Sequence, residues 1–346
     1  MAKKKKEESE ESNVDSFFNS GIFKKMSKDY GKQFAVPLDS ISDRDRGIVR
    51  TKPSLDLALS GGLQMGQLVQ IAGAPKTGKT TLAWEIGAAF QKQFTDKNIY
   101  YYKVEGRLSS SLSDGIEGLD KNRVIIVQST EDKILSGTDY LEIFEILMRE
   151  NPSSLHIIDS IAGIVSNAEM SSGLGDQQMG DLPKLLAKLC RRNSNVIGIT
   201  NSLVVSLNHI RANMNSKSTG FTGGNHWKHQ LDTDIRIKQS FPNGKIMDQS
   251  GENQIGHNLD IDVFTTTLGP PRQKATLPLI YGRCIQTLQY CILLWIEMGI
   301  VEKAGAWFSF DEHKVQGQKK LEELIYSNED AKNSLVKQVE ALVYGE

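Results

Sequence analysis

One short segment carries residue types that bind phosphate. Residues 73–80 read Gly-Ala-Pro-Lys-Thr-Gly-Lys-Thr, which fits the pattern G-x-x-x-x-G-K-[ST] at every fixed position. The two glycines let successive backbone N–H groups turn toward phosphate oxygens. Lys79 would reach the β and γ phosphates, and the Thr80 hydroxyl would ligate Mg²⁺. A chance glycine-rich turn is the alternative, but an apolar strand before the segment and a helix after it argue against that. The sequence therefore predicts an ATP site made of Gly73, Ala74, Pro75, Lys76, Thr77, Gly78, Lys79, Thr80 and Thr81.

Two carboxylates stand where such a site needs them. Asp159 follows the run His156-Ile157-Ile158 and would hold a water molecule bound to Mg²⁺. Taken alone, Asp159 is better explained as a helix cap, but together with the phosphate-loop match it indicates the metal site. Glu105 closes the expected strand 98–104, and ligands bind at the carboxyl ends of parallel strands. Glu105 is therefore a candidate to orient the water that attacks the γ phosphate.

Alternating strands and helices are expected to position these residues. Apolar strands followed by helices predict an α/β fold with a parallel sheet covered on both faces. The expected strands are 68–72, 98–104, 123–128, 155–158 and 204–208, and the expected helices are 80–90, 140–150 and 182–192. After Thr233 the pattern changes to antiparallel strands at 234–239, 258–267 and 275–280, with a hairpin signal at Asn243-Gly244.

Composition excludes several classes of protein. The 346 residues hold 39% hydrophobic and 24% charged residues, which is ordinary for a globular protein. No run of about 18 apolar residues predicts a membrane span, and the N-terminus lacks the apolar segment of a secretory signal. Cys190, Cys284 and Cys291 have no paired spacing, which favours a reducing, cytoplasmic compartment. The net charge of −1 means that any affinity for nucleic acid must come from local basic residues.

The ends of the chain differ from its centre. Residues 1–13 are Lys, Glu and Ser, which predicts a disordered charged tail. Apolar residues recur at helical spacing in 14–30, which predicts a short amphipathic helix whose apolar face needs a cover. We expect residues 14–47 to be this helix and a linker, 48–285 to be the core, and 286–346 to be a small α+β domain that ends in a charged helix from about Asn328.

Four further segments carry a resemblance to a known family. Leu57 to Gly66 reads LALSGGLQMG, and Asn208-His209-Ile210-Arg211 follows a predicted core strand. Thr222-Gly223-Gly224-Asn225 and the segment EKAGAWFS from Glu302 to Ser309 complete the set. Together with the phosphate loop, these segments resemble the RecA family of homologous-recombination ATPases, of the bacterial and phage type. The resemblance covers roughly residues 48–343 and implies a RecA-like P-loop core with a twisted, mostly parallel sheet.

The resemblance also implies an activity and partners. It implies a DNA-dependent ATPase that forms a helical filament on single-stranded DNA, pairs with homologous double-stranded DNA and exchanges strands. Single-strand-binding and mediator proteins are implied partners, and the implied compartment is the cytoplasm of a bacterial cell or a phage-infected host. Glu105 matches the catalytic glutamate of the family and acts there with Lys79. His209 stands where many members have glutamine that senses the γ phosphate, and its titration would make that coupling sensitive to pH.

The expected DNA contacts lie in two loops and one helix. Loop one would be residues 167–180 and loop two residues 211–223, both rich in Gly, Ser and Asn. In the family an apolar side chain wedges between base triplets at the positions of Met179 and Met214. A helix behind loop one carries Lys184, Lys188, Arg191 and Arg192 with a spacing that predicts a basic stripe. The resemblance assigns eight residues to DNA binding. They are Met179, Gly180, Lys184, Arg191, Arg211, Met214, Gly223 and Gly224.

The sequence departs from the family at residues that, in a filament, would reach into the ATP site of the neighbouring subunit. Bacterial members have two lysines that reach from one subunit into the next, and here those positions are Thr265 and Thr267. Threonine cannot supply positive charge to the γ phosphate. Arg272 or Lys274 would have to act in trans instead.

Two other functions remain open from the sequence. A hexameric replicative helicase core uses the same fold, although the segment EKAGAWFS and the glycine pair argue against it. An ATP-binding recombination mediator without strand exchange is the second alternative, and the missing lysines keep it open.

Overall fold

The computed structural model describes residues 13–40, 46–105, 113–173, 181–212, 219–239, 244–248, 250–282, 284–285, 292, 294–296 and 298–344. Contacts divide the chain into two units, Met1–Gly47 and Ile48–Glu346. Within the described ranges, no helix is long and apolar enough to cross a membrane.

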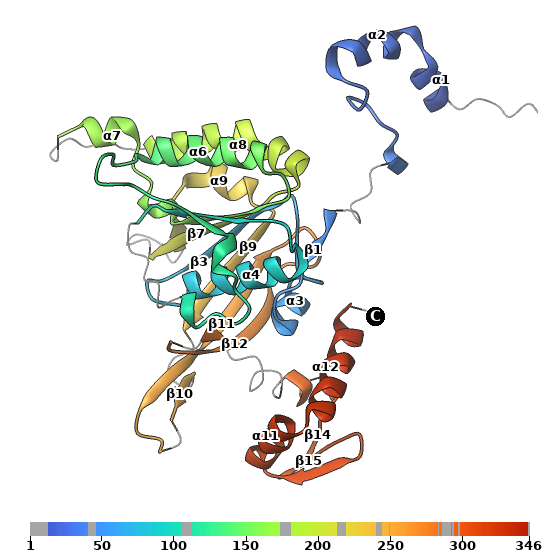
Figure 1. Ribbon diagram of the computed structural model, residues 1–346, viewed down its shortest axis with the longest axis vertical. Helices are drawn as coiled ribbons and strands as arrows, with labels where there is room; N and C mark the ends of the chain where they lie inside the picture. The colour runs from blue at the N-terminus through green and yellow to red at the C-terminus, as the bar shows by residue number, and fades with distance from the viewer. Residues whose placement is uncertain are drawn as a thin grey trace, which may run out of the picture. The chain divides into compact units, whose positions relative to one another are not determined.

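A twisted sheet forms the centre of the second unit (Figure 1). Its parallel part has the strand order β9-β3-β7-β6-β4-β5. The strands are β3 (Leu68–Gly73), β4 (Ile99–Lys103), β5 (Val124–Val127), β6 (Leu155–Asp159), β7 (Leu203–Ala212) and β9 (Thr233–Gln239). Strands covered on both faces have no water-facing side, so they read as apolar runs in the sequence. The predicted α/β class and the five predicted parallel strands are confirmed.

Helices cover both faces of this sheet (Figure 1). The helix α4 (Lys79–Gln93) packs on one face, and α6 (Gly137–Glu150), α8 (Asp181–Thr200) and α9 (Gly224–Gln230) pack on the other. Successive side chains of β4 point to opposite faces. Tyr101 accordingly stacks on Trp84 of α4, whereas Tyr102 packs against Phe144 of α6.

The helix α8 is longer than the predicted 182–192. The residues after Arg192 are weak helix formers, so the sequence does not show that the helix continues. Ile197 is nevertheless buried and extends the apolar stripe begun by Leu186 and Cys190. Packing of that stripe therefore overrides local propensity.

The antiparallel part of the sheet continues from β9 in the order β9-β11-β12-β13. These strands are β11 (Gln254–Thr265), β12 (Gln273–Ile280) and β13 (Cys284–Ile285), while β10 (Lys245–Met247) pairs with β11 alone. The predicted antiparallel pairing is confirmed. The predicted hairpin turn at Asn243-Gly244 lies partly outside the described residues. The strand that follows it, β10, pairs with β11.

A turn around Asp248 lies between β10 and β11. The Asp248 carboxylate accepts hydrogen bonds from Ser250 Oγ at 2.6 Å and Asn253 Nδ2 at 2.7 Å. These bonds hold the pKa of the Asp248 carboxyl well below its usual range.

In the N-terminal unit, the described residues of the segment 14–30 form two α-helices where the sequence predicts one. The helix α1 (Asn13–Asn19) ends before Ser20, and α2 (Gly21–Tyr30) begins after it. The Ser20 hydroxyl oxygen accepts a hydrogen bond from the backbone N–H of Phe23 at 3.1 Å, which caps α2 and explains the break. Phe17, Phe18 and Phe23 pack edge to face with centroids 5.0–5.7 Å apart. The predicted tail of residues 1–13 lies almost wholly outside the described residues.

The last part of the chain is a small α+β arrangement. An antiparallel sheet has the order β14-β15-β16, and two helices follow it. Asn328 caps the final helix through Oδ1, which accepts from the N–H groups of Asp330 and Ala331 at 3.1 Å, as the predicted helix start requires. The elements are β14 (Glu302–Ala304), β15 (Trp307–Phe310), β16 (His313–Gln316), α11 (Gln318–Ser327) and α12 (Glu329–Tyr344).

Shorter elements connect the larger ones. They are η1 (Leu38–Ser40), β1 (Ile48–Val49), α3 (Pro53–Ala58), β2 (Leu63–Gln64), η3 (Lys121–Arg123), η4 (Ile161–Gly163), α7 (Asn167–Ser171) and β8 (Thr219–Phe221).

Candidate active site

The phosphate loop joins β3 to α4, as its sequence predicts. Gly78 precedes α4 with a left-handed φ of 87°, and a Cβ on it would lie 2.9 Å from Leu279 Cδ1. A Cβ on Gly73 would lie 2.7 Å from the carbonyl oxygen of Ile237. Both positions therefore require glycine. The Thr77 hydroxyl donates to the Ala74 carbonyl at 2.8 Å, which closes the loop on itself.

Lys79 is the first residue of α4, and its ammonium turns back onto the loop. Nζ donates to the carbonyl oxygens of Gly73 at 3.2 Å and Ala74 at 2.8 Å. Burial lowers the pKa of Lys79, while the nearby carboxylates of Asp159 and Glu105 act in the opposite direction. A phosphate oxygen carries negative charge, which a carbonyl oxygen lacks, so it is the stronger acceptor for the Lys79 ammonium. Phosphate oxygens can therefore replace the two carbonyls as acceptors.

Asp159 ends β6 and faces the start of α4. Its Oδ2 atom accepts a hydrogen bond from Thr80 Oγ1 at 3.0 Å and another from the Tyr101 hydroxyl at 2.5 Å. Burial raises the pKa of Asp159, although both hydrogen bonds lower it. Thr80 and Asp159, assigned to one site from the sequence, therefore lie in direct contact. Tyr101 is a member of the site that the sequence did not indicate.

Glu105 lies two residues past the end of β4 and contacts the ends of two other strands. Its Oε1 atom accepts a hydrogen bond from the Ser160 hydroxyl and lies 3.2 Å from His209 Nε2. In the sheet register, His209 of β7 is the partner of Gly73, the first residue of the phosphate loop. The two side chains predicted to act on the γ phosphate thus meet at the carboxyl edge of the sheet, beside the loop.

A buried amide network ties β7 to the end of loop two. Asn208 Nδ2 donates to Gln70 Oε1 and to the carbonyl oxygen of Thr222, each at 2.8 Å. Trp227 is 1% exposed, and its Nε1 donates to the same Gln70 oxygen at 2.9 Å. Trp227 is therefore a core residue. The network gives both ends of loop two fixed positions relative to His209.

Both predicted loops are more ordered at their ends than their composition suggests. Loop two starts and ends in paired strands, since β7 runs to Ala212 and β8 pairs with it in antiparallel register. Loop one begins with the short helix α7, which Ser166 caps by accepting from the N–H of Glu169 at 3.1 Å. Met179, Gly180 and Met214 lie outside the described residues.

The remaining loop-two residues are placed by their backbones. Arg211 lies in β7 opposite Gly220. Gly223 and Gly224 have left-handed φ values of 115° and 78°, and Gly223 precedes α9. A Cβ on Gly223 would lie 3.1 Å from Leu186 Cδ1, so the glycine lets α9 approach α8 closely.

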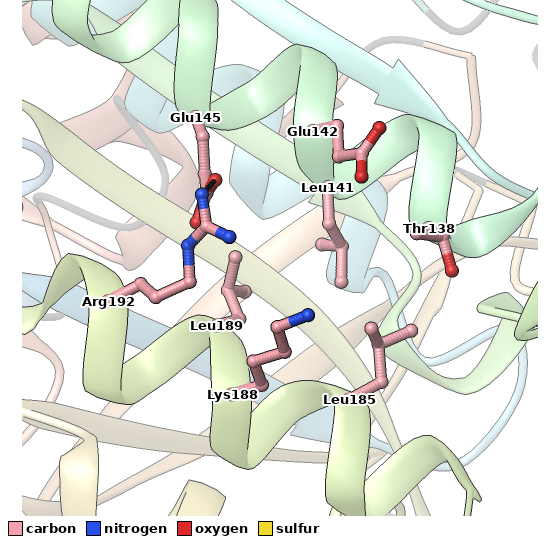
Figure 2. Close-up of a pocket in the computed structure, with 8 residues that line it drawn as sticks. All are labelled: Thr138, Leu141, Glu142, Glu145, Leu185, Lys188, Leu189 and Arg192. Atoms are coloured by element: carbon pink, nitrogen blue, oxygen red, sulfur yellow. Dashed lines mark hydrogen bonds and ion pairs between the residues drawn. The ribbon is translucent and has the colours of Figure 1, made fainter.

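The basic residues of α8 divide into two sets. Arg192 Nη2 contacts Glu145 Oε2 of α6 at 2.6 Å, and Lys188 lines the small cavity between the two helices (Figure 2). The predicted stripe of Lys184, Lys188 and Arg192 is therefore partly engaged within the fold. Lys184 and Arg191 are both exposed and lie seven residues apart, two turns along the helix. Lys184 Nζ lies 3.6 Å from Asp181 Oδ1 on the surface.

The residues considered for a role in trans lie beyond β9. Thr267 Oγ1 accepts a hydrogen bond from Gln67 Nε2 at 2.5 Å. The guanidinium of Arg272 lies 3.5 Å from the centre of the Phe264 ring, and that of Arg236 lies 3.2 Å from it. Two groups so close to one ring must stack on its opposite faces. Arg272 is thus held by its own chain, while Lys274 pairs with Asp262 in the strand register.

Sequence comparison identifies the family. The sequence model of the RecA N-terminal domain matches residues 19–286, and that of the RecA C-terminal domain matches residues 293–343. The chain belongs to the RecA family. Protein RecA of Gloeobacter violaceus is 30% identical over 298 residues, which cover 83% of this chain and 77% of the relative.

Two other relatives match over a longer stretch. Protein RecA of Porphyromonas gingivalis is 28% identical over 323 residues, or 91% of each chain. Protein RecA of Chloroherpeton thalassium is 29% identical over 326 residues, or 92% of this chain and 88% of the relative.

Membership of the RecA family fixes the activity in outline. The chain is a recombination and repair protein, a nucleotide-binding DNA-dependent ATPase that binds DNA and forms filaments. The helicase and mediator alternatives are not favoured. The RecA match spans the phosphate loop and both carboxylates in one domain and the segment EKAGAWFS in the other.

Proposed function

We propose that this RecA family chain uses Mg²⁺ and ATP to assemble on single-stranded DNA, pairs it with homologous duplex and exchanges the strands. One observation carries the proposal: Lys79, Thr80, Asp159, Glu105 and His209 meet at the ends of four neighbouring strands, and the strand of His209 continues into loop two. That arrangement joins a site for phosphate chemistry to a segment that contacts DNA.

The donor set around Asp159 suits magnesium. Thr80 and Asp159 offer two hard oxygen ligands within 3.0 Å of each other. Mg²⁺ prefers oxygen and is usually held by one or two protein groups together with waters and substrate phosphates. Among the described residues, no three His, Cys, Asp or Glu side chains gather around one point, which agrees with such a sparse protein contribution. When bound, the ion would neutralise charge on the β and γ phosphates.

Each side chain then has a distinct task in hydrolysis. Lys79 would leave the carbonyls of Gly73 and Ala74 and bind phosphate oxygens. Glu105 would orient the attacking water and accept its proton, and Ser160 holds the carboxylate for that role. His209 contacts Glu105, so a movement of β7 that binds or releases DNA would also shift the glutamate.

DNA would lie against the two loops and the exposed side of α8. Met179 and Met214 would separate bases, while Gly180, Gly223 and Gly224 would let backbone come close to the strand. Lys184, Arg191 and Arg211 would contact phosphates, which gives the chain with net charge −1 its local affinity for DNA.

Self-association would use the N-terminal unit. Ile22 and Tyr30 of α2 are 68% and 71% exposed, an apolar surface that water does not favour. We propose that the segment 14–47 packs on a neighbouring subunit and that the neighbour's Arg272 or Lys274 completes the ATP site. Single-strand-binding and mediator proteins are further partners, and the cytoplasm of a bacterial cell or an infected host would be the compartment.

Disrupting this apolar surface tests filament formation. Ile22→Asp is expected to abolish filaments on single-stranded DNA with a slowly hydrolysed ATP analogue, because it places a charge in the subunit contact. Nucleotide affinity measured without DNA is expected to stay within about twofold, since the phosphate loop, Asp159 and Glu105 all lie within one subunit. Electron microscopy and nucleotide titration measure the two effects. Lys28→Asp, on the opposite side of α2, is the matched control, and filaments of normal length from Ile22→Asp would refute the contact.

Substituting His209 tests the coupling to DNA. His209→Ala is expected to reduce the stimulation of hydrolysis by DNA about tenfold, the value of one good polar contact. His209→Gln is expected to keep the stimulation, because the glutamine amide can also donate a hydrogen bond to a phosphate oxygen. Equal stimulation by DNA in the parent and in His209→Ala would contradict the role.

A further inference from the structure

Tyr101 lies beside the ATP site without a role in the activity described above. It is the third residue of β4 and is 2% exposed. Its hydroxyl donates to Asp159 Oδ2 at 2.5 Å, the same oxygen that accepts the bond from Thr80 at 3.0 Å. One carboxylate oxygen therefore joins the start of α4, the end of β6 and the middle of β4.

The sheet register explains how the phenol reaches the carboxylate. Tyr101 pairs with Ile157 and Lys103 pairs with Asp159, so the Tyr101 backbone lies two residues short of Asp159 along the neighbouring strand. The length of the phenol spans that offset. A shorter side chain at this position would not reach the end of β6.

A second contact fixes the direction of the phenol. The Tyr101 ring stacks on the Trp84 indole of α4, with centroids 4.7 Å apart and an interplanar angle of 11°. Trp84 is also 2% exposed, so neither ring has room to turn. The tyrosine is therefore held by the helix that begins with Lys79 and Thr80, and it holds the carboxylate that faces that helix.

A purely structural role is the simpler explanation, since a buried tyrosine hydroxyl usually finds a partner. Tyr102 of the same strand is an example of a purely structural hydroxyl. It lies 3.0 Å from His156 Nδ1, on the other face of the sheet and away from the phosphate loop. Tyr101 differs because its acceptor is a buried carboxylate that also bonds to Thr80. Burying a carboxylate is favourable only if donors fix its oxygens.

We propose that Tyr101 is a positioning residue for the metal half of the ATP site: its hydroxyl fixes Asp159 against Thr80 before Mg²⁺ and nucleotide bind. The proposal deepens the proposed function and rests on its assignment of Mg²⁺ to Thr80 and Asp159. Nucleotide contacts that need no metal, such as those of Lys79 and the loop backbone, do not depend on Tyr101.

Tyr101→Phe removes the hydroxyl and keeps the stacked ring. The magnesium concentration that half-saturates binding of a fluorescent ADP, measured without DNA, is expected to rise about tenfold, the effect of losing one bond to a charged group. Binding of the same nucleotide in EDTA is expected to stay unchanged.

Tyr102→Phe is the matched control, because it deletes a buried hydroxyl from the same strand on the opposite face. It is expected to lower thermal stability without changing the magnesium requirement. An unchanged magnesium requirement in Tyr101→Phe, or an equal rise in both variants, would overturn the proposal. If Tyr101→Phe does not fold, Trp84→Leu provides the second test: it loosens the phenol without removing its hydroxyl and should raise the requirement in the same direction, and no rise would overturn the proposal.

Asp159→Asn separates this proposal from the one on which it rests. If Asp159→Asn loses the magnesium dependence of binding and Tyr101→Phe keeps the parental requirement, the metal site stands and the positioning role fails. If neither variant changes the dependence on magnesium, the assignment of the metal site to Asp159 fails.

Discussion

Glu105→Gln is expected to lower DNA-stimulated ATP hydrolysis by about 10²- to 10⁴-fold, the usual contribution of a general base. The amide has nearly the shape of the carboxylate and can keep the contact with Ser160, but it cannot accept a proton from water. ATP affinity is expected to change little, because the substitution leaves intact Lys79 and the loop backbone, which would hold the phosphates. Phosphate release with and without single-stranded DNA, together with nucleotide titration, measures both effects.

The same variant should separate binding from hydrolysis in the filament. Filaments of Glu105→Gln are expected to persist with ATP, since release of DNA requires turnover in this account. Glu150→Gln makes the same chemical change at an exposed position at the end of α6 and serves as the control. Turnover of Glu105→Gln within tenfold of the parent would remove Glu105 from the catalytic role.

Arg272→Ala and Lys274→Ala test the neighbour's half of the site. At least one of them is expected to lower DNA-stimulated turnover by about 10²-fold or more, the effect of losing one group that stabilises the transition state, with a smaller loss of nucleotide affinity. Arg272 stacks on Phe264 and approaches Asp262 Oδ2 at 3.6 Å, so its own chain holds it in one orientation. Thr265→Ala, which removes no charge, is the control.

Mixing subunits shows whether the charge acts in trans. Lys79→Ala subunits have no working phosphate loop but keep Arg272 and Lys274. An equal mixture with the affected Ala variant should recover about a quarter of the parental rate, because half of the subunits keep a working loop and half of their neighbours keep the charge. A mixture that stays as inactive as its two components would place the residue in its own subunit's site. Parental turnover in both single variants would remove both residues from the mechanism.

Much of the ATP site follows from local sequence. The phosphate loop has a fixed pattern between an apolar strand and a helix, and Asp159 and Glu105 come at the ends of strands that read as apolar runs. Parallel strands bring their carboxyl ends to one edge, so these residues were expected to meet. The antiparallel strands after Thr233 were also predicted, because the sequence pattern changes there from strands followed by helices to strands followed by turns.

Features that depend on pairing between distant segments were not predicted. Tyr101 and Asp159 meet only because β4 lies beside β6, and three consecutive tyrosines give no signal in the sequence of which one faces α4. The paired ends of loop two and the hairpin of β10 with β11 also depend on which strand edges are free. The prediction of one helix in residues 14–30 was also wrong. The apolar spacing there fits a single helix, but Ser20 caps a second one.

The most direct test of the central claim is strand exchange between a circular single strand and a labelled homologous linear duplex, with magnesium and ATP. The parent chain is expected to transfer the labelled strand, a non-homologous duplex should give no product, and Lys79→Ala should give none with either duplex. Filaments and DNA-dependent ATP hydrolysis without any transfer between homologous partners would contradict the account and would identify the chain as a recombination mediator.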